Sequence, residues 1–333
     1  MNIHEAEVII KEHNEAIGGE ENYRAFDALN FSTLSQLAKN PKFVNVEKED
    51  QPYFVFGRYT EDLFMKEDMD KKYVVGSIPP PTGQMFTYVD ALYKNGGDHP
   101  DAYNTVQEAN GDTKLRTSPD KFIENFNKNG KAYYYFLKTS EGKSVISADE
   151  ALLAQKMVVA LDNLEIIQEF KAHAKYKIYF QVPLLSTAMG VAVKVLVDIL
   201  VVDTEENILY PIDLKTSSAG LQEFSKSAGK YRYDIQASLY SYVISNSFAN
   251  YSMHPFEFLV VSKYTPDTPK FFRTTTSDIY HGRFGIVTPY GTKIKGWEQL
   301  IEEYKKHKEA DYWDLPVELW ENTIQLDMYN YGG

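Results

Sequence analysis

The sequence predicts an α/β protein in which a central β-sheet is flanked by helices. Three observations support this fold class: apolar residues recur at helical spacing before the middle of the chain, strand-like segments with a period of two follow them, and a second helix then precedes a further strand. The strands are expected at 176–182, 191–202, 208–214 and 256–262, and the helices at about 148–173 and 233–247.

The composition is that of a folded, acidic protein without cysteine. Of 333 residues, 35 are Lys or Arg and 47 are Asp or Glu, which gives a formal net charge of −12, and 43% are hydrophobic. These values exclude wholesale disorder, and the absence of cysteine excludes disulfides, thiolate zinc sites and a cysteine nucleophile. No signal peptide or transmembrane run is evident, so we expect a cytoplasmic protein without membrane attachment.

The first part of the chain is predicted to be helical and then interrupted. Helices are expected at 3–17, from Ser32 or Ser35 to just before Asn40, and at 59–65. Proline, glycine and asparagine then become frequent, which is typical of an insertion or subdomain. The expected division is an N-terminal helical part at 1–75, an insertion at 76–145, the core at 146–310 and a tail at 311–333.

Ser147 is predicted to cap the long helix. It precedes Glu150 by three residues, the spacing of a capping box in which the two residues satisfy each other's free backbone N–H groups. The helix is expected to continue to about His173, and a C-terminal helix to span 297–308.

Two acidic residues are predicted to face each other across a hairpin. The polar segment 203–207 is typical of a turn, so the strands on either side of it should pair antiparallel. A turn centred on Glu205–Glu206 places Asp198 opposite Asp213, with alpha carbons roughly 5 Å apart. Strict alternation would put Asp198 on the same strand face as Leu200.

This arrangement indicates a metal site. Two carboxylates on an apolar sheet repel each other, and their burial is costly unless a positive charge lies between them. Oxygen ligands favour Mg²⁺ or Mn²⁺. Lys215 follows Asp213 by two residues on the same face, where an ammonium could stabilise charge developing on a phosphate or help orient and deprotonate water.

The D-x14-D-x-K pattern of Asp198, Asp213 and Lys215 resembles the PD-(D/E)xK nuclease superfamily. Residues 233–240, YDIQASLY, resemble the Y-x-x-Q-x-x-x-Y helix of its RecB-like and exonuclease VIII (RecE-like) branch, and the phage-type members of that branch in particular. Upstream, 54–61 is similar to the family's G-x-x-x-H helix, with Glu61 where many relatives carry a metal-binding histidine. The missing cysteines exclude the subgroup that holds an iron–sulfur cluster.

The resemblance implies a restriction-endonuclease-like core with a mixed sheet, and a Mg²⁺-dependent deoxyribonuclease. It implies an exonuclease on linear DNA ends in recombination, replication or repair, in the host cytoplasm if phage-encoded. DNA would be the substrate, a recombination or replication protein a candidate partner, and oligomerisation is left open. The implied site comprises Asp198, Asp213 and Glu61 as metal ligands, Lys215, Gln236 and Tyr240 as further catalytic residues, and Lys226, Lys230, Arg232 and Tyr233 as DNA contacts.

Two alternatives stay open. One, from a different class, is a catalytically silent DNA-binding or assembly protein with the same fold, and the other is an endonuclease on RNA or branched DNA, which shares the chemistry. Gln236 and Tyr240 share a helix face and could instead brace the core, while Glu165 and Glu169 are reserve candidates for the third acid. The polarity of digestion is not indicated by any motif.

Overall fold

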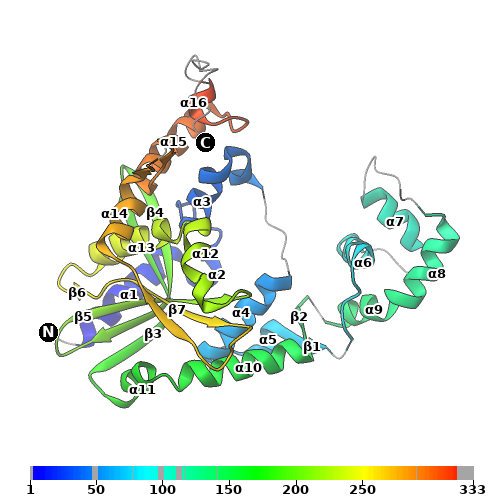
Figure 1. Ribbon diagram of the computed structural model, residues 1–333, viewed down its shortest axis with the longest axis horizontal. Helices are drawn as coiled ribbons and strands as arrows, with labels where there is room; N and C mark the ends of the chain where they lie inside the picture. The colour runs from blue at the N-terminus through cyan, green and yellow to red at the C-terminus, as the bar shows by residue number, and fades with distance from the viewer. Residues whose placement is uncertain are drawn as a thin grey trace. The chain divides into compact units, whose positions relative to one another are not determined.

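The computed structural model (Figure 1) describes residues 3–46, 52–76, 78–96, 101–109, 115, 117–140, 142–289 and 291–320. Its contacts divide the chain into two compact units. The first comprises residues 1–49 and 159–333, and the second comprises residues 50–158. This division differs from the predicted boundaries at 75, 145 and 310, which stay a prediction about domains.

The first unit is built on a mixed sheet with strand order β3-β4-β5-β7-β8, in which β6 also pairs with β5. Strands β3, β4 and β5 are antiparallel neighbours, whereas β5 and β7 are parallel. A parallel pair needs a crossover connection, and helices α12 and α13 lie between these strands in the chain. The predicted α/β class is confirmed, with strands β3 Tyr176–Ala188, β4 Val191–Asp203, β5 Ile208–Ser217, β6 Ser252–Met253, β7 Glu257–Ser262 and β8 Lys270–Arg273.

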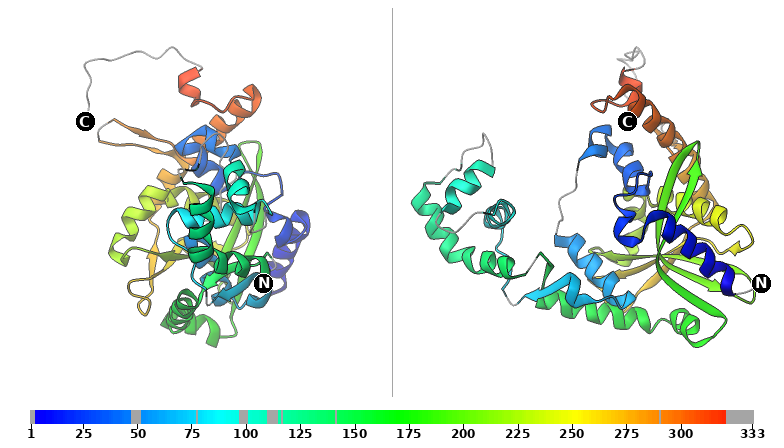
Figure 2. Two further views of the ribbon diagram at one scale, coloured as in Figure 1. Left: turned by 90° about the vertical axis from the view of Figure 1, so that its right-hand side faces the viewer. Right: turned by 180° about the vertical axis from the view of Figure 1, so that it is seen from behind.

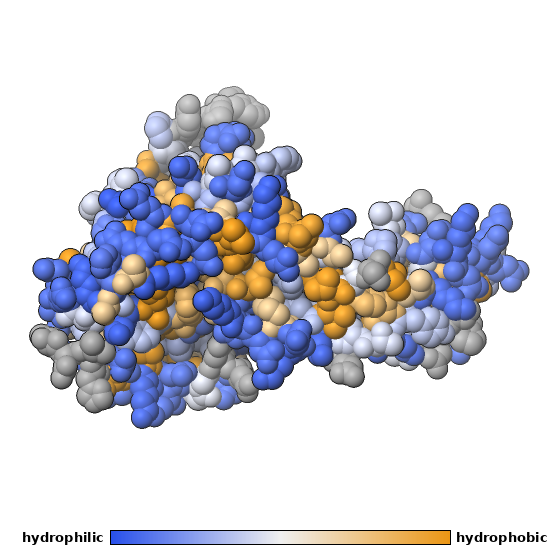
Figure 3. All heavy atoms as spheres, turned by 90° about the horizontal axis from the view of Figure 1, so that it is seen from below, coloured by the Kyte–Doolittle hydropathy of each residue, from blue (hydrophilic) through white to orange (hydrophobic). Residues whose placement is uncertain are grey.

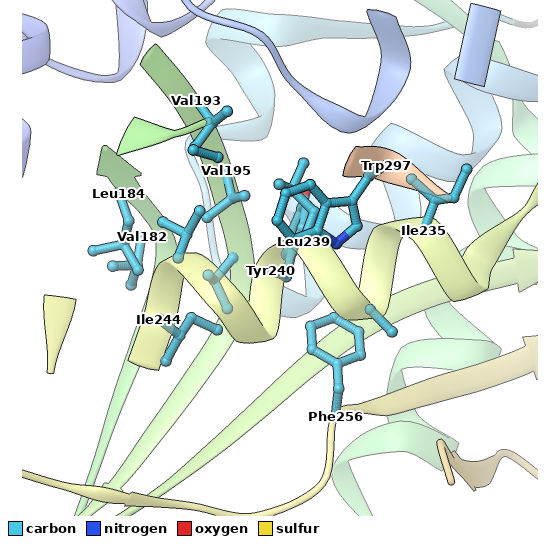
Figure 4. Close-up of a cluster of buried hydrophobic side chains, with 14 of the residues drawn as sticks. Val182, Leu184, Val193, Val195, Ile235, Leu239, Tyr240, Ile244, Phe256 and Trp297 are labelled. Atoms are coloured by element: carbon cyan, nitrogen blue, oxygen red, sulfur yellow. The ribbon is translucent and has the colours of Figure 1, made fainter. Parts of the chain in front are cut away.

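Helix α13 (Tyr233–Ser247) provides much of the cover for one face of this sheet. Ile235, Leu239 and Ile244 project from it into a core that also contains Val195 of β4 (Figure 4). The helix is buried along most of its length because α14 lies against it in turn: a Cβ on Gly282 of α14 would come within 2.0 Å of the Asp234 carbonyl oxygen. Only glycine allows this close crossing.

Helix α1 (Ile3–Ile17) runs beside β3, which is an edge strand of the sheet (Figure 2). The Leu185 backbone N–H donates to His13 Nδ1 at 3.1 Å, so a helix side chain satisfies a donor on the strand edge. The remaining elements of this unit are α2 Glu20–Tyr23, α3 Phe31–Lys39, α11 Glu165–Ala172, α12 Phe224–Tyr231, α14 Thr276–Phe284, α15 Trp297–Ala310, α16 Val317–Trp320, the hairpin β9 Ile286–Val287 with β10 Lys293–Ile294, and two 3₁₀ turns at Pro41–Asn45 and Leu221–Glu223.

The second unit has a largely aromatic core between helices. Phe122, Phe126 and Tyr134 are completely buried, and their rings contact one another. Two short parallel strands, β1 and β2, pair within this unit. Its elements are α4 Pro52–Met65, α5 Met69–Lys72, β1 Tyr73–Gly76, α6 Gln84–Lys94, α7 Ala102–Ala109, α8 Pro119–Asn129, α9 Lys131–Thr139 and β2 Ser144–Ser147, and α10 Ala148–Asp162 contains the boundary to the first unit.

Several sequence predictions need correction at helix ends. The single helix to His173 is wrong, because Leu164 has an extended backbone and the Gln168 side chain donates to the Asp162 carbonyl, which ends α10 and begins α11. Helix α3 is capped by Asn30, not by a serine: Asn30 Oδ1 accepts from the Thr33 N–H at 2.9 Å. Ser147 does cap α10, with its hydroxyl accepting from the Glu150 N–H.

The described helices and one face of the surface were compared with what a membrane-spanning segment requires. The face shown in Figure 3 is largely hydrophilic, with hydrophobic areas interspersed. Among the described residues, no helix combines the length and the apolar character needed to cross a membrane.

Candidate active site

The site lies where strands β4 and β5 diverge. Their ladder runs from Asp203 opposite Ile208 to Ile199 opposite Ile212, which confirms the predicted register. It stops one step before Asp198 would face Asp213. Beyond that point β4 continues to pair with β3, and β5 continues to pair with β7, so the sheet forks at the two acids.

The Asp198 carboxylate bridges the start of this fork. Its Oδ2 accepts a hydrogen bond from the Leu214 backbone N–H at 3.0 Å, so a side chain replaces the next backbone bond of the ladder. The two acids therefore lie on neighbouring strands, as the hairpin predicts, with Asp198 held against the backbone of β5.

The strict alternation expected for β4 does not hold across Asp198. Val195 and Val197 share one core with Leu200, although they differ from it in parity. The cause lies on β3, where Gln181, the residue expected opposite Asp198, has a left-handed backbone with φ of 48° and interrupts the β3–β4 ladder. The side chains of β4 therefore exchange faces of the sheet at this point, and Asp198 occupies the irregular position.

Asp213 is the most enclosed acid of the site, with 2% of its surface exposed. Gln236 Nε2 donates to its Oδ1 at 2.5 Å, and Lys215 Nζ lies 2.5 Å from its Oδ2. Burial would lower the pKa of Lys215, but the charges of Asp213 and Asp198 outweigh that effect and raise it. Lys215 is therefore held as an ammonium, which favours stabilisation of charge over abstraction of a proton.

Helix α13 brings Gln236 and Tyr240 to the acids, as their spacing predicts. Figure 4 shows Tyr240 projecting from this helix into the interior, and it is 9% exposed. Burial, followed by the proximity of Tyr23, Asp213 and Asp198, raises the pKa of Tyr240 well above its usual value. Tyr240 is therefore a neutral phenol that can donate a hydrogen bond.

The open side of the fork is closed by an N-terminal segment that sequence reasoning missed. Leu29 pairs with β4 beyond the point where β5 has left it: its N–H donates to the Ala192 carbonyl at 2.9 Å, and its carbonyl accepts from the Lys194 N–H at 2.8 Å. The segment thereby satisfies backbone groups that the fork would otherwise leave unpaired.

Lys194 fixes this segment against the strand. Its side chain is 2% exposed, and Nζ donates to the carbonyls of Tyr23, Phe26 and Arg24 at 2.5, 2.6 and 3.3 Å. The ammonium also lies 4.9 Å from the centroid of the Tyr23 ring. Burial and then the charge of Asp198 raise the pKa of Tyr23, so this tyrosine is a site neighbour. A lysine within an otherwise apolar strand was the signal that could have revealed it.

The donor set fits a hard divalent cation. Asp198 and Asp213 supply carboxylate oxygens; the buried Gln236 Oε1 accepts no hydrogen bond among the described residues, and Asp213 Oδ2 has the Lys215 ammonium as its partner. Oxygen ligands of this kind suit Mg²⁺ or Mn²⁺. Over the same residues, no three His, Asp or Glu side chains form a group that could hold a metal. Glu61 lies on α4 in the second unit, and its role as third ligand stays a prediction.

The reserve acids are not brought to the site. Glu165 and Glu169 are exposed on α11, and Glu169 accepts from the Tyr176 hydroxyl at 3.4 Å. Tyr176 pairs with Asp203, five residues along β4 from Asp198, which is roughly 16 Å in an extended strand.

The predicted DNA contacts fall into two groups. Lys226 and Lys230 are exposed on α12, one helical turn apart. Arg232, in contrast, makes a two-pronged ion pair with Asp234 and donates to the Lys295 carbonyl, so its guanidinium already has partners within the fold. Tyr233 is partly buried, and Lys215 Nζ lies 5.2 Å from its ring centroid.

A forked mixed sheet with paired acids, a lysine two residues after the second acid, and a glutamine–tyrosine helix defines a PD-(D/E)xK-type domain. Comparison with protein families agrees: residues 22–286 match the family described as a PDDEXK-like domain of unknown function, and the chain belongs to this family. The predicted membership of the PD-(D/E)xK superfamily is thus confirmed.

The chain was also compared with solved structures and with curated proteins. The solved structures that match include a crystal structure from Eubacterium rectale, provisionally described as an exonuclease, with 12% sequence identity and a TM-score of 0.37. The match covers 72% of this chain and 88% of that one. No curated protein matches.

Proposed function

We propose that the chain is a metal-dependent nuclease that hydrolyses phosphodiester bonds in DNA, acting as an exonuclease on linear ends in recombination, replication or repair. The observation that carries the proposal is the environment of Asp213. One buried carboxylate is held by Gln236 on one oxygen and by the Lys215 ammonium on the other, and Asp198 is bonded to the backbone next to it.

Asp198 and Asp213 would hold Mg²⁺ or Mn²⁺, with Glu61 as a third ligand. When bound, such an ion polarises a phosphate oxygen and lowers the pKa of a coordinated water. The Lys215 ammonium adds positive charge beside the two carboxylates, where it can stabilise the negative charge that develops on the phosphate.

The remaining residues orient this centre. Gln236 fixes the direction of the Asp213 carboxylate through its Nε2, and the neutral Tyr240 phenol can donate to a phosphate oxygen or to water. Lys226 and Lys230 are exposed and can meet the phosphate backbone. Arg232 and Tyr233 act in this proposal by shaping the surface that follows β5.

The test is a cleavage assay with purified protein and Mg²⁺, Mn²⁺ or EDTA. Linear duplex, nicked circle, closed circle and single strands are the substrates. Metal-dependent loss of linear DNA alone supports the proposal. Cleavage of closed circles or RNA would indicate the endonuclease alternative, and binding without cleavage of any substrate would indicate the silent DNA-binding protein.

Metal binding can be tested separately from turnover. Ca²⁺ or Mg²⁺ should raise the melting temperature, because a ligand that binds the folded state stabilises it. Asp198→Asn should reduce that rise. An unchanged response to both cations in this variant would show that the two acids do not share a site.

A further inference from the structure

An exposed aromatic ring with two lysines lies next to the site. Tyr231, the last residue of α12, is 43% exposed. Lys230 Nζ lies 5.5 Å from its ring centroid, and Lys39 Nζ of α3 lies 6.0 Å from it. We refer to Tyr231, Lys39 and Lys230 as the Tyr231 cluster.

The ring of Tyr231 is connected to the site through Tyr233. The two rings are stacked, with centroids 5.9 Å apart and an interplanar angle of 30°. Tyr233 in turn stacks on Phe258 at 5.3 Å, and Lys215 Nζ lies 5.2 Å from its centroid. Aromatic surface therefore runs from solvent to the lysine of the proposed active site.

The backbone holds these two tyrosines in place. Arg232 between them has a left-handed conformation with φ of 59°, which ends α12 and begins α13. A side chain other than glycine adopts this conformation at a cost, and the ion pair with Asp234 together with the bond to the Lys295 carbonyl offsets it. The stack is thus maintained by a fixed turn and does not depend on flexible side chains alone.

The charges around the ring suit a nucleic acid strand. Within the described part of the chain, Lys39, Lys226 and Lys230 form no ion pair with a carboxylate, although the whole chain carries a net charge of −12. Lysines of this kind neutralise phosphates, while an exposed aromatic ring stacks on a base of any sequence. A base offers its flat face only when it is unpaired or at an end, since the bases of a duplex are stacked on their neighbours.

We propose that the Tyr231 cluster is a stacking site for an unpaired nucleotide, which guides a single strand past Tyr233 toward Lys215. The inference rests on the proposed nuclease function and names the form of its substrate: a strand separated from its complement before it reaches the acids.

The test measures binding in EDTA, where a metal-dependent nuclease does not cleave. Fluorescence anisotropy compares a short single-stranded oligonucleotide with a blunt duplex of the same sequence. Tyr231→Ala should weaken single-strand binding about 5- to 100-fold, which is the usual effect of one lost stacking contact. Tyr231→Phe should retain it, because the ring is kept.

Controls separate stacking from charge and from folding. Tyr280→Ala removes another exposed tyrosine, 58% exposed, whose ring contacts are with His281 and Phe284 of its own helix, and should change nothing. Affinity falls as the salt concentration rises, and Lys39→Ala and Lys230→Ala should each make the slope of log affinity against log salt less steep by about one. A 2-aminopurine base in the oligonucleotide should be quenched by wild type and not by Tyr231→Ala.

Wild-type affinity of Tyr231→Ala for single strands would overturn the proposal, as would an equal loss on single strand and duplex. The nuclease function can fail independently of this site. If wild type cleaves DNA but Tyr231→Ala binds normally, the stacking site alone is overturned. If wild type never cleaves but binds single strands through Tyr231, the stacking site stands and the nuclease function falls.

Discussion

The interiors of the two units differ in what they bury. Among the described residues, the second unit buries two polar side chains, Thr60 and Ser140, and both hydroxyls donate to backbone carbonyls one turn earlier. The first unit buries charged residues as well. These are Lys194, Asp203, Asp213, Glu257 and Glu303.

Four of these five charges have a structural explanation. Asp203 pairs with Lys175 and accepts from the backbone of the following turn, Glu257 pairs with Arg273, and Glu303 pairs with Lys295. Lys194 binds three carbonyls. Asp213 differs because both of its partners, Gln236 and Lys215, belong to the site and Asp198 lies beside it on the neighbouring strand. The comparison teaches that a buried charge indicates function when its partners form a cluster with a second carboxylate and not an isolated ion pair.

The largest effect is expected from Asp213→Asn. Losing this carboxylate removes a metal ligand and the partner of Lys215, so cleavage should fall by at least about 10² to 10³-fold, with the fold retained. Asp203→Asn is the matched control. It should lower the melting temperature while leaving the cleavage rate of the folded protein close to wild type. Similar losses of cleavage in both variants would contradict the distinction between the two acids.

Lys194→Met tests the structural charges. It leaves three buried carbonyls without their donor, so the free energy of unfolding in urea should drop by about 2 to 4 kcal/mol. Thr60→Val in the second unit removes one hydroxyl bonded within its own helix and should cost under about 1 kcal/mol. A Lys194 variant as stable as wild type would mean that the N-terminal segment closes the fork without this lysine.

Gln236→Ala should have a smaller effect on cleavage. It removes the hydrogen bond to Asp213 Oδ1, worth about 1 to 3 kcal/mol, while calorimetric calcium binding should persist. Ser241→Ala, on the same helix, is the control. The buried hydroxyl that it removes has no hydrogen-bond partner among the described residues, so cleavage should stay close to wild type. Loss of calcium binding in the Gln236 variant would make Gln236 a metal ligand, and unchanged cleavage would reduce it to a core-bracing residue.

The smallest effect is expected on the pH dependence of the free energy of unfolding, through His13. Burial lowers its pKa from 6.5, and its Nδ1 must stay unprotonated to accept the Leu185 N–H. The unfolded chain then binds more protons near pH 6, so the contribution to stability is present above pH 6.5 and is lost as pH falls below it. Urea unfolding at pH 7.5 and pH 5 should show a difference of under about 1 kcal/mol that His13→Asn lacks. An identical pH response in wild type and variant would rule this out.

The sequence could predict the parts of the site that depend on local geometry. The register of Asp198 and Asp213 follows from one short turn, and α13 follows the strand that carries Lys215 after only a 3₁₀ turn and the short helix α12. The closing of the fork by Leu29 and Lys194 could not be predicted, because it joins segments more than 160 residues apart without any shared period. The left-handed Gln181 was hidden for a related reason: its conformation is imposed by the sheet and not by its own propensity.

The fork also determines which turns can accept inserted residues. Strands β3 and β4 are joined by a two-residue turn, Met189 and Gly190, beyond the point where β5 stops pairing with β4. Extra residues there would leave the spacing of the two carboxylates unchanged. One extra residue in the turn after Asp203 that slipped the β4–β5 ladder would set Asp198 against a side chain of the opposite face. Homologues with this domain should therefore accept insertions in the β3–β4 turn and keep a fixed length in the β4–β5 turn.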